Sequence, residues 1–426
     1  MRVIQIPFEK YSLDNGLRVV LARDSRVPVV AVNLWYNVGS RNERPGRTGF
    51  AHLFEHMMFQ GSEHVPELMH FSLIEKAGGS LNGSTWLDRT NYFETLPAHW
   101  LELGLWLEAD RMGGLLPAMT QDKLDNQRDV VKNERRWRVD NQPYGDWDER
   151  IQAMMYPSDH PYHHSVIGSM EDLDAASLED VGEFFRTYYA PNNAVLTLCG
   201  EFDPAHARRL IETHFGAIPE GPELPPIPGR TALPDTLSSE VRDTVQQDVS
   251  LARVYLAFRI PAYGDDRFYA AGVAAHVLGW GKAARLYRAL VRDRQLAQEV
   301  MAFAFPIVVS ASMLVIIATA RPGVAREALE AALLEEVAAM RDVSADDVTR
   351  AINLLEARHL TDLQRMEERA DLLSMYETLF SDAGRINTEI ERIRGVSVAD
   401  VRELAETRFG EDNRAVLWYL PRNGGA

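Results

Sequence analysis

The feature that most constrains the fold is a pattern that occurs twice, 220 positions apart. The repeated pairs are Ser177 and Ser397, Asp180 and Asp400, Thr187 and Thr407, and Asn193 and Asn413. In both places the serine and the acid three positions later predict a helix that starts with a capping box. An apolar run follows each helix and predicts a strand. Four matches at one offset favour a duplicated domain, with a chance likeness of helix-turn-strand endings as the alternative.

A Pro-rich stretch from Pro219 to Pro234 separates the two halves. Proline cannot continue a helix or a central strand, so this stretch is predicted to be a linker. We therefore expect one domain over residues 1–218, a linker over 219–236 and a second, homologous domain over 237–426. The length of 426 residues fits two domains of roughly 200 residues each.

Both halves contain strand and helix patterns. The apolar runs Val29–Tyr36 and Leu251–Phe258 predict a buried strand early in each half. Helical periodicity follows, most clearly over Glu327–Met340 and Val348–Leu360. This mixture predicts an α+β fold in which helices pack on a sheet in each domain.

Composition excludes some classes of partner. The formal net charge of −17 disfavours a nucleic acid, because a phosphate backbone binds to a basic surface. No stretch reaches the roughly 18–20 apolar residues of a membrane span. The nearest is Ile307–Ala320, which contains two serines and is predicted to be a buried strand. The N-terminus lacks the apolar segment of a signal peptide, so we expect a cytoplasmic protein, or a periplasmic one if a signal peptide was removed.

The segment His52-Leu53-Phe54-Glu55-His56 predicts a metal site. Two histidines four positions apart on a helix lie on one face, where both imidazoles can reach one ion. Glu55 borders the same face and can contact a water beside the metal without being a ligand. The alternative is a pair of core histidines with a carboxylate partner.

Such a site needs a third protein ligand. Because Cys199 is the only cysteine, a thiolate cluster is excluded and the ligand must be His or a carboxylate. The candidate is Glu134, which follows an apolar pair on a predicted helix, and Asp129 is a weaker one. The alternative for Glu134 is an exposed acid paired with Arg135 or Arg138.

A second histidine cluster, His160-Pro161-Tyr162-His163-His164, is expected to be structural. Three histidines in a loop could bind a metal, but the sequence shows no acid that matches them.

The residues around His52 resemble the pitrilysin-type, or inverzincin, zinc metallopeptidases, whose signature is H-x-x-E-H. The likeness is greatest to the short-chain branch that includes the mitochondrial processing peptidase beta subunit and bacterial two-subunit relatives. It extends over Tyr11–Arg18, Val38–Glu43, Gly49–Phe59 and Val130–Glu134. The resemblance implies two homologous domains with mostly antiparallel sheets. It also implies one Zn²⁺ per chain, held by His52, His56 and Glu134, with Glu55 as the catalytic general base and acid.

The resemblance also suggests how substrate binds. Gly79–Thr85 is similar to an edge strand that pairs with an extended peptide. Asn82, Gly83, Ser84 and Phe59 are therefore expected to contact substrate. The alternative for Asn82 is an ordinary turn residue.

Two departures from the family pattern matter. Gln127 stands where the family often has an acid, seven residues before the ligand Glu. Val291 and Gln298 stand where relatives with a complete site have an Arg and a Tyr. The resemblance therefore implies a dimer, either with a homologous chain that carries the Arg/Tyr pair or with a second copy of this chain.

The expected function is a zinc endopeptidase that hydrolyses peptides or unfolded polypeptide segments, as the zinc-bearing subunit of a dimeric peptidase. One alternative is a non-catalytic structural subunit of the same fold, and another is an unrelated zinc hydrolase of small molecules. The four intact positions His52, Glu55, His56 and Glu134 favour the peptidase.

Overall fold

The computed structural model describes residues 4–422 and divides into two compact units. The first unit is built from the described residues of Met1–Arg135, from His164–Pro228 and from Thr361–Thr388. The second is built from Arg136–His163, from Gly229–Leu360 and from the described residues of Glu389–Ala426. Each unit contains one sheet and its own set of helices, which confirms the predicted α+β class.

The first unit contains a six-stranded sheet in the order β1-β2-β6-β3-β5-β4. Its strands are β1 (Glu9–Ser12), β2 (Arg18–Arg23), β3 (Val29–Tyr36), β4 (Ser80–Thr85), β5 (Thr90–Pro97) and β6 (Ala194–Gly200). All neighbours are antiparallel except β2 and β6, which are parallel. The strand predicted over Val29–Tyr36 is confirmed as β3, and the predicted peptide-pairing segment forms β4 at the edge of the sheet.

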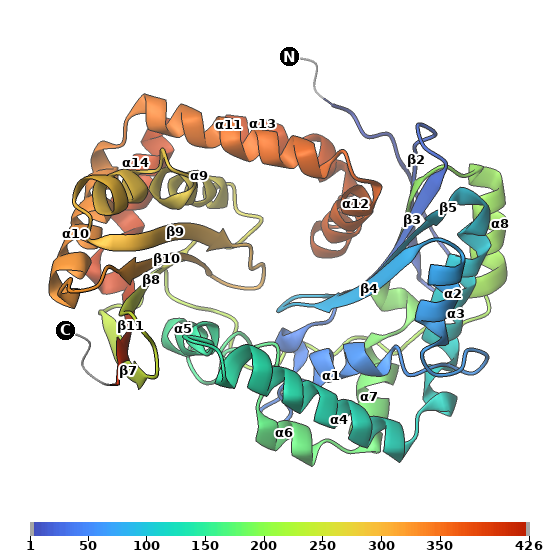
Figure 1. Ribbon diagram of the computed structural model, residues 1–426. Coiled ribbons are helices and arrows are strands. Elements are labelled where there is room, and N and C mark those ends of the chain that lie inside the picture. The colour runs from blue at the N-terminus through green and yellow to red at the C-terminus, as the bar shows by residue number, and fades with distance from the viewer. Residues whose placement is uncertain (1–3, 423–426) are drawn as a thin grey trace. The chain divides into compact units, whose positions relative to one another are not determined.

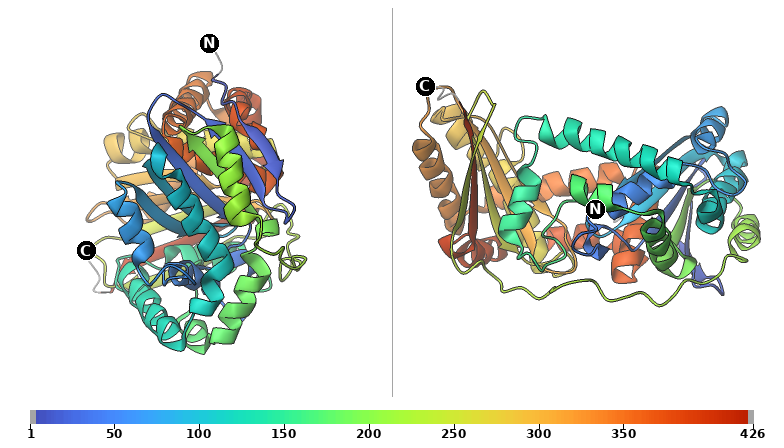
Figure 2. Two further views of the ribbon diagram at one scale, coloured as in Figure 1. Left: turned by 90° about the vertical axis from the view of Figure 1, so that its right-hand side faces the viewer. Right: turned by 90° about the horizontal axis from the view of Figure 1, so that it is seen from below.

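The two faces of this sheet are covered by different parts of the chain (Figure 1). On one face, Val30, Val32 and Leu34 of β3 join a core formed with α1, α3 and α8. Figure 2, left, looks onto α3 and α8 on that side. Residues that alternate with these point to the other face, where the Trp35 indole N–H donates to Asp371 of α12 at 2.7 Å.

The helices of the first unit are short to medium in length. They are α1 (Phe50–Met57), α2 (Met69–Lys76), α3 (Leu101–Ala118), α4 (Gln121–Arg135), α6 (Met170–Ala175), α7 (Leu178–Tyr188), α8 (Pro204–Phe215) and α12 (Met366–Phe380).

The second unit repeats the topology of the first. Its sheet has the order β7-β11-β8-β10-β9, again with one parallel pair, β7 and β11, followed by antiparallel neighbours. The strands are β7 (Val241–Gln247), β8 (Arg253–Ile260), β9 (Ala297–Phe305), β10 (Ser312–Ala320) and β11 (Arg414–Pro421). The helices are α5 (Trp147–Met155), α9 (Arg267–Gly279), α10 (Arg326–Ala338), α11 (Ala345–Asp362), α13 (Glu389–Arg394) and α14 (Val398–Arg408).

Two predicted elements of this unit have different bounds in the structure. The strand predicted over Leu251–Phe258 forms two residues later, as β8. The strand predicted over Ile307–Ala320 begins only at Ser312. The Ser312 hydroxyl accepts the backbone N–H of Ile307 and donates to its carbonyl, so the chain turns there before β10 starts.

The repeated residues make the same hydrogen bonds in both units. Ser177 and Ser397 each form a capping box with the acid three positions later. The Thr187 and Thr407 hydroxyls donate to the carbonyls of Glu183 and Glu403 at 2.8 Å in each case. The Asn193 and Asn413 amides donate to carbonyls five residues earlier. Together with the shared strand order, these equivalent contacts confirm the duplication.

The predicted contiguous domain boundaries do not coincide with the compact units. Residues 136–163 precede the Pro-rich stretch but belong to the second unit, and Thr361–Thr388 follows it but belongs to the first. The reason is packing: α12 lies against β3 and β6, where Ala370 and Leu373 are buried and Ser374 donates to Thr197. The division into a domain over 1–218, a linker over 219–236 and a second domain over 237–426 stays a prediction.

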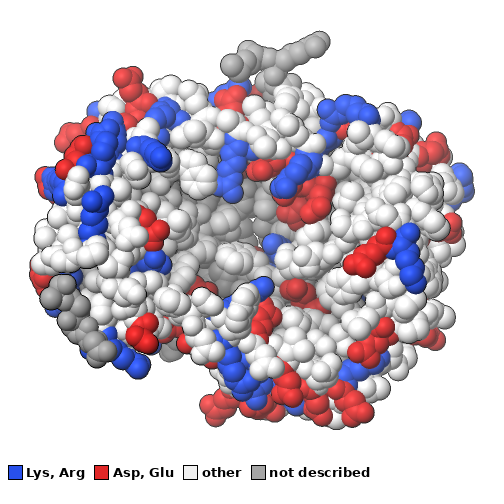
Figure 3. All heavy atoms as spheres, in the orientation of Figure 1, with Lys and Arg blue, Asp and Glu red and all other residues white. Residues whose placement is uncertain are grey.

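On the face shown in Figure 3, acidic and basic side chains are interspersed and form no single large acidic area. Among residues 4–422, none of the helices combines the length and the apolar character that crossing a bilayer requires.

Candidate metal centre

The helix α1 presents two histidines on one side and its apolar residues on the other. His52 and His56 are half-buried, and their ring centroids lie 4.8 Å apart. Phe50, Leu53 and Met57 are buried in the core of the first unit. This packing holds the helix by its apolar face and leaves both imidazoles directed to the same side.

The helix α4 brings Glu134 to the two histidines. Its Oε2 atom lies 3.3 Å from Nε2 of His56 and 3.7 Å from Nε2 of His52. Val131, one turn earlier on α4, is buried in the same core as α1. Glu134 is therefore directed at α1. Its side chain is only 16% exposed, so it is not an exposed surface acid. Asp129 is exposed and is not part of the cluster.

The three side chains fit a zinc ion. Their ligand atoms all lie within 4.8 Å of one another. Tetrahedral zinc with donors at about 2.0–2.1 Å requires donors about 3.3–3.4 Å apart. The two separations measured from Glu134 are 3.3 and 3.7 Å. Two imidazoles and one carboxylate are also the donor set of many catalytic zinc sites, in which a fourth position stays open.

Glu55 lies beside the cluster and is held by Thr85. The Thr85 hydroxyl, on the edge strand β4, donates to Oε2 of Glu55 at 2.5 Å. Burial raises the pKa of Glu55 above its ordinary value, against the opposing effects of the Thr85 hydrogen bond and of the charges on His56 and Arg89. One carboxylate oxygen is thus fixed by β4, and the other, Oε1, can accept a proton.

The Thr85→Val variant should lower kcat by about 10- to 100-fold, because a hydrogen bond to a charged group contributes about 1.5–3 kcal/mol. The zinc content should not change, since Thr85 is not a ligand. Steady-state peptide hydrolysis and metal analysis measure both quantities. Thr85→Ser is the matched control and should retain most of the activity. A Thr85→Val protein with wild-type kcat would show that Glu55 needs no such support.

The predicted substrate contacts lie along β4 but differ in exposure. Asn82 is exposed, and the Ser84 hydroxyl donates to Asn91 at 2.7 Å. Gly83 packs so closely on Phe59 and Tyr92 that an added Cβ would meet both rings at 3.1 Å. Phe59 itself is only 9% exposed, and its ring packs against Gly83 of β4. β4 pairs with β5 on one side, and no other described strand pairs with it. The substrate roles of these residues stay predictions.

The positions that depart from the family pattern lie on α4 and in the second unit. Gln127 is buried on α4, two turns before Glu134. Val291 is buried in the second unit, and Gln298 is exposed near the start of β9.

The histidine-rich loop has an acid partner that the sequence did not indicate. His164 has a matching acid, because its Nε2 atom lies 2.9 Å from Oε2 of Glu43. Nδ1 of His160 accepts the backbone N–H of Tyr162, and Nδ1 of His163 lies 2.8 Å from the carbonyl of Tyr156, seven residues earlier. Among the described residues, the only potential metal-binding group is His52, His56 and Glu134. The sequence analysis did not identify the roles of Thr85 and Glu43. Each contacts a partner that is distant in the sequence and is brought close only by the tertiary fold.

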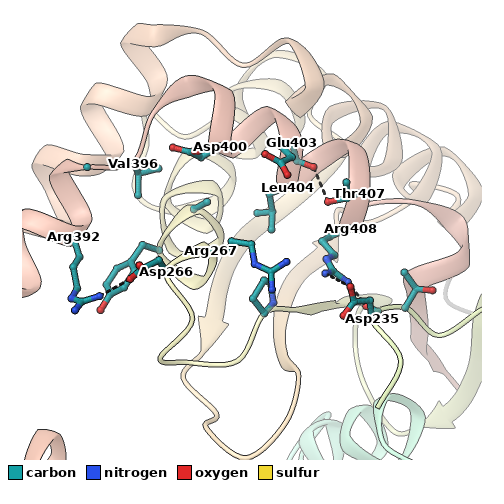
Figure 4. Close-up of a pocket in the computed structure, with 15 residues that line it drawn as sticks. Asp235, Asp266, Arg267, Arg392, Val396, Asp400, Glu403, Leu404, Thr407 and Arg408 are labelled. Carbon is teal, nitrogen blue, oxygen red and sulfur yellow. Dashed lines mark hydrogen bonds and ion pairs between the residues drawn. The ribbon is translucent and has the colours of Figure 1, made fainter. Parts of the chain in front are cut away.

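Two cavities occupy equivalent places in the two units, away from these ligands. One of about 740 Å³ in the second unit is lined by Asp400, Glu403, Leu404, Thr407 and Arg408 (Figure 4). One of about 440 Å³ in the first unit is lined by Asp180, Glu183, Phe184, Thr187 and Tyr188, each 220 positions earlier. Neither is lined by a histidine of the metal cluster, so both are features of the duplicated fold.

Comparisons with known proteins agree with this geometry. The family model described as "Insulinase (Peptidase family M16)" matches residues 18–160, and that described as "Peptidase M16 inactive domain" matches residues 175–355. The chain is 30% identical over 425 residues to the zinc protease PqqE of Helicobacter pylori, covering 97% of this chain and 93% of that one. It is 28% identical over 211 residues to the mitochondrial-processing peptidase subunit beta of Blastocladiella emersonii, covering 49% of this chain and 44% of that one.

The fold also matches a solved structure. The crystal structure of a protease from Helicobacter pylori superposes with a TM-score of 0.91 at 27% identity, covering 97% of this chain and 99% of that one.

Proposed function

The chain belongs to peptidase family M16, and from this premise we propose that it is a zinc-dependent endopeptidase. The observation that carries the proposal is the meeting of His52, His56 and Glu134, whose ligand atoms lie within 4.8 Å of one another. Glu55 borders the same cluster from α1. All four residues lie within the stretch that matches the peptidase model, and none lies in the stretch that matches the inactive-domain model.

The proposed chemistry divides between the metal and Glu55. Zinc bound by the three ligands would supply a Lewis acid that polarises a peptide carbonyl and makes a nearby water more acidic. Glu55 takes the proton of the attacking water at Oε1 while Thr85 holds Oε2. The same carboxyl group then returns the proton to the leaving nitrogen as the peptide bond breaks.

The proposed substrate is an extended peptide or an unfolded polypeptide segment. The edge strand β4 ends at Thr85, whose hydroxyl contacts Glu55. A peptide that added itself to β4 as a further strand would therefore run past the catalytic carboxylate. Most of the backbone of a folded protein is already hydrogen-bonded within the protein, so this mode of binding favours extended chains as substrates.

A non-catalytic structural subunit of the same fold is the second candidate. A subunit without catalysis has no need to keep three metal ligands and a base in one cluster. The retained geometry of His52, Glu55, His56 and Glu134 therefore supports the catalytic proposal over this one.

We further propose that this chain completes its active site as part of a dimer. In the family pattern, an Arg and a Tyr act from the second domain, and here Val291 and Gln298 stand in their places. Val291 has no donor where the pattern has the charged donors of Arg, and Gln298 offers an amide N–H where the pattern has the Tyr hydroxyl. A homologous chain with the Arg/Tyr pair would supply the missing donors. In a dimer of two copies of this chain, other residues would have to supply them, because both copies carry Val291 and Gln298.

The test is hydrolysis of an unstructured oligopeptide, followed by mass spectrometry, with the purified chain alone and with the homologous Arg/Tyr chain from its own organism. We expect slow cleavage alone, at least tenfold faster cleavage with the partner, and none after chelation. Full turnover by the chain alone would overturn the partner proposal. No cleavage under any condition with zinc bound would overturn the peptidase proposal.

A further inference from the structure

The N-terminus of the metal helix α1 is capped by a buried glutamate. Oε2 of Glu43 accepts the backbone N–H of Gly49 at 2.9 Å, and Oε1 accepts that of Ala51 at 2.8 Å. The Glu43 side chain is fully buried. A carboxylate at this end of a helix satisfies N–H groups that lack partners within the helix and interacts favourably with the helix dipole. Ala51 precedes the ligand His52, so Glu43 fixes the first turn of the helix that carries this ligand.

His164 holds that carboxylate in place. Its Nε2–H donates to Oε2 of Glu43 at 2.9 Å and to the carbonyl of Ser40 at 3.0 Å. Because a carbonyl oxygen can only accept, the proton of the ring must be on Nε2. His164 therefore contacts the start of α1 indirectly, through Glu43. It is the first residue of the segment His164–Ala176.

Gly168, in the same segment, touches α1 directly through its backbone. An added Cβ at Gly168 would lie 2.3 Å from the Gly49 nitrogen. Gly168 also has a positive φ of 70°, a conformation that favours glycine. Asp172 adds a further tie, because it accepts the backbone N–H of Thr48 at 2.9 Å. The start of α1 is thus fixed against this segment on several sides.

The same segment is also bonded to α4, which carries the third ligand. Arg135, next to Glu134, donates to the carbonyl of Gly168 at 2.8 Å. Lys132 pairs with Asp174 at 2.6 Å. Arg128 donates to the carbonyls of Leu173 and Ala176 at 2.8 and 2.7 Å. Residues 128, 132 and 135 lie along one face of α4, so the contact extends over two turns of the helix.

We propose that His164–Ala176, together with Glu43, is a brace that sets the spacing between α1 and α4 and thereby between the histidine ligands and Glu134. Gly168 is central to the brace, since its Cα lies against Gly49 at the start of α1 and its carbonyl accepts from Arg135 of α4. Glu43 and Gly168 are positioning residues, because neither is a ligand. The inference rests on the proposed metal site and goes beyond it by assigning what holds the ligands at binding distance.

The test compares Gly168→Ala with Gly46→Ala. Both glycines have a positive φ and lie near α1, but an added Cβ at Gly46 meets nothing within 4 Å. The matched control therefore carries the backbone strain without the clash. We expect Gly168→Ala to weaken zinc binding by about 10- to 100-fold, the range typical for residues that support metal ligands. Gly46→Ala should stay within about twofold of the wild type by the same measure.

A second variant keeps the test decisive if Gly168→Ala does not fold. Glu43→Gln has nearly the same shape but loses the charge that caps α1, and we expect at least a tenfold loss of zinc affinity. Affinity is measured by competition with a chromophoric chelator, and folding by circular dichroism of the metal-free proteins. Folded Glu43→Gln with wild-type affinity would overturn the brace. A wild type that binds no zinc would instead overturn the proposed metal site, and the brace with it.

Discussion

The Glu55→Gln variant should bind zinc as tightly as the wild type and hydrolyse peptides about 10²- to 10⁴-fold more slowly, the range typical for loss of a general base. The amide has almost the same size as the carboxylate, and its oxygen can still accept from the Thr85 hydroxyl. It cannot take a proton from water at neutral pH. The change therefore removes the proton transfer and leaves the three ligands in place.

The measurements for Glu55→Gln are metal content, zinc affinity and kcat/KM on one peptide. Glu75→Gln is a suitable control, because Glu75 is an exposed glutamate on α2. Activity within tenfold of the wild type would mean that Glu55 is not the base. Loss of zinc in the variant would mean instead that Glu55 helps to hold the metal.

The Glu134→Ala variant should lose zinc and, with it, activity. Residues that merely support metal ligands contribute about 10- to 100-fold in affinity, so removal of a ligand itself should cost on the order of 10³-fold or more. The two histidines remain on α1 but cannot form a three-ligand site without α4. Zinc at about 1,000 times its dissociation constant should stabilise the wild type by about 4 kcal/mol and leave the variant unchanged.

Thermal unfolding with and without zinc measures this difference. Asp129→Ala is the matched control, since Asp129 is an exposed acid on the same helix, outside the cluster. It should keep both zinc binding and zinc-dependent stabilisation. If Asp129→Ala lost zinc while Glu134→Ala kept it, the third ligand would have been assigned to the wrong acid.

Local patterns in the sequence predicted the elements that depend on neighbouring residues. The spacing of His52 and His56 places both on one face of a helix, whatever the rest of the chain does. The capping boxes at Ser177 and Ser397 likewise involve residues three positions apart, and both formed. Because these local patterns recur at a constant offset, the sequence also predicted that the two halves share one topology, and the two sheets do.

Packing between distant segments decided the rest. The apolar face of α12 belongs to the first unit, although the Pro-rich stretch lies between them in the chain. No periodicity within α12 indicates which sheet it covers, since an amphipathic helix can bury its apolar face on any apolar surface. The contiguous division of the chain, which stays a prediction, could not indicate which compact unit α12 joins.

The metal cluster contains both kinds of information. The sequence by itself determined that His52 and His56 share a helix face and that Glu55 borders it, because helical geometry is a local property. Only the tertiary structure decided that Glu134 lies 3.3 Å from His56, that Thr85 holds Glu55 and that Glu43 meets His164. These contacts join segments far apart in the chain, and their distances follow from how α1, α4 and β4 pack rather than from any spacing along the sequence.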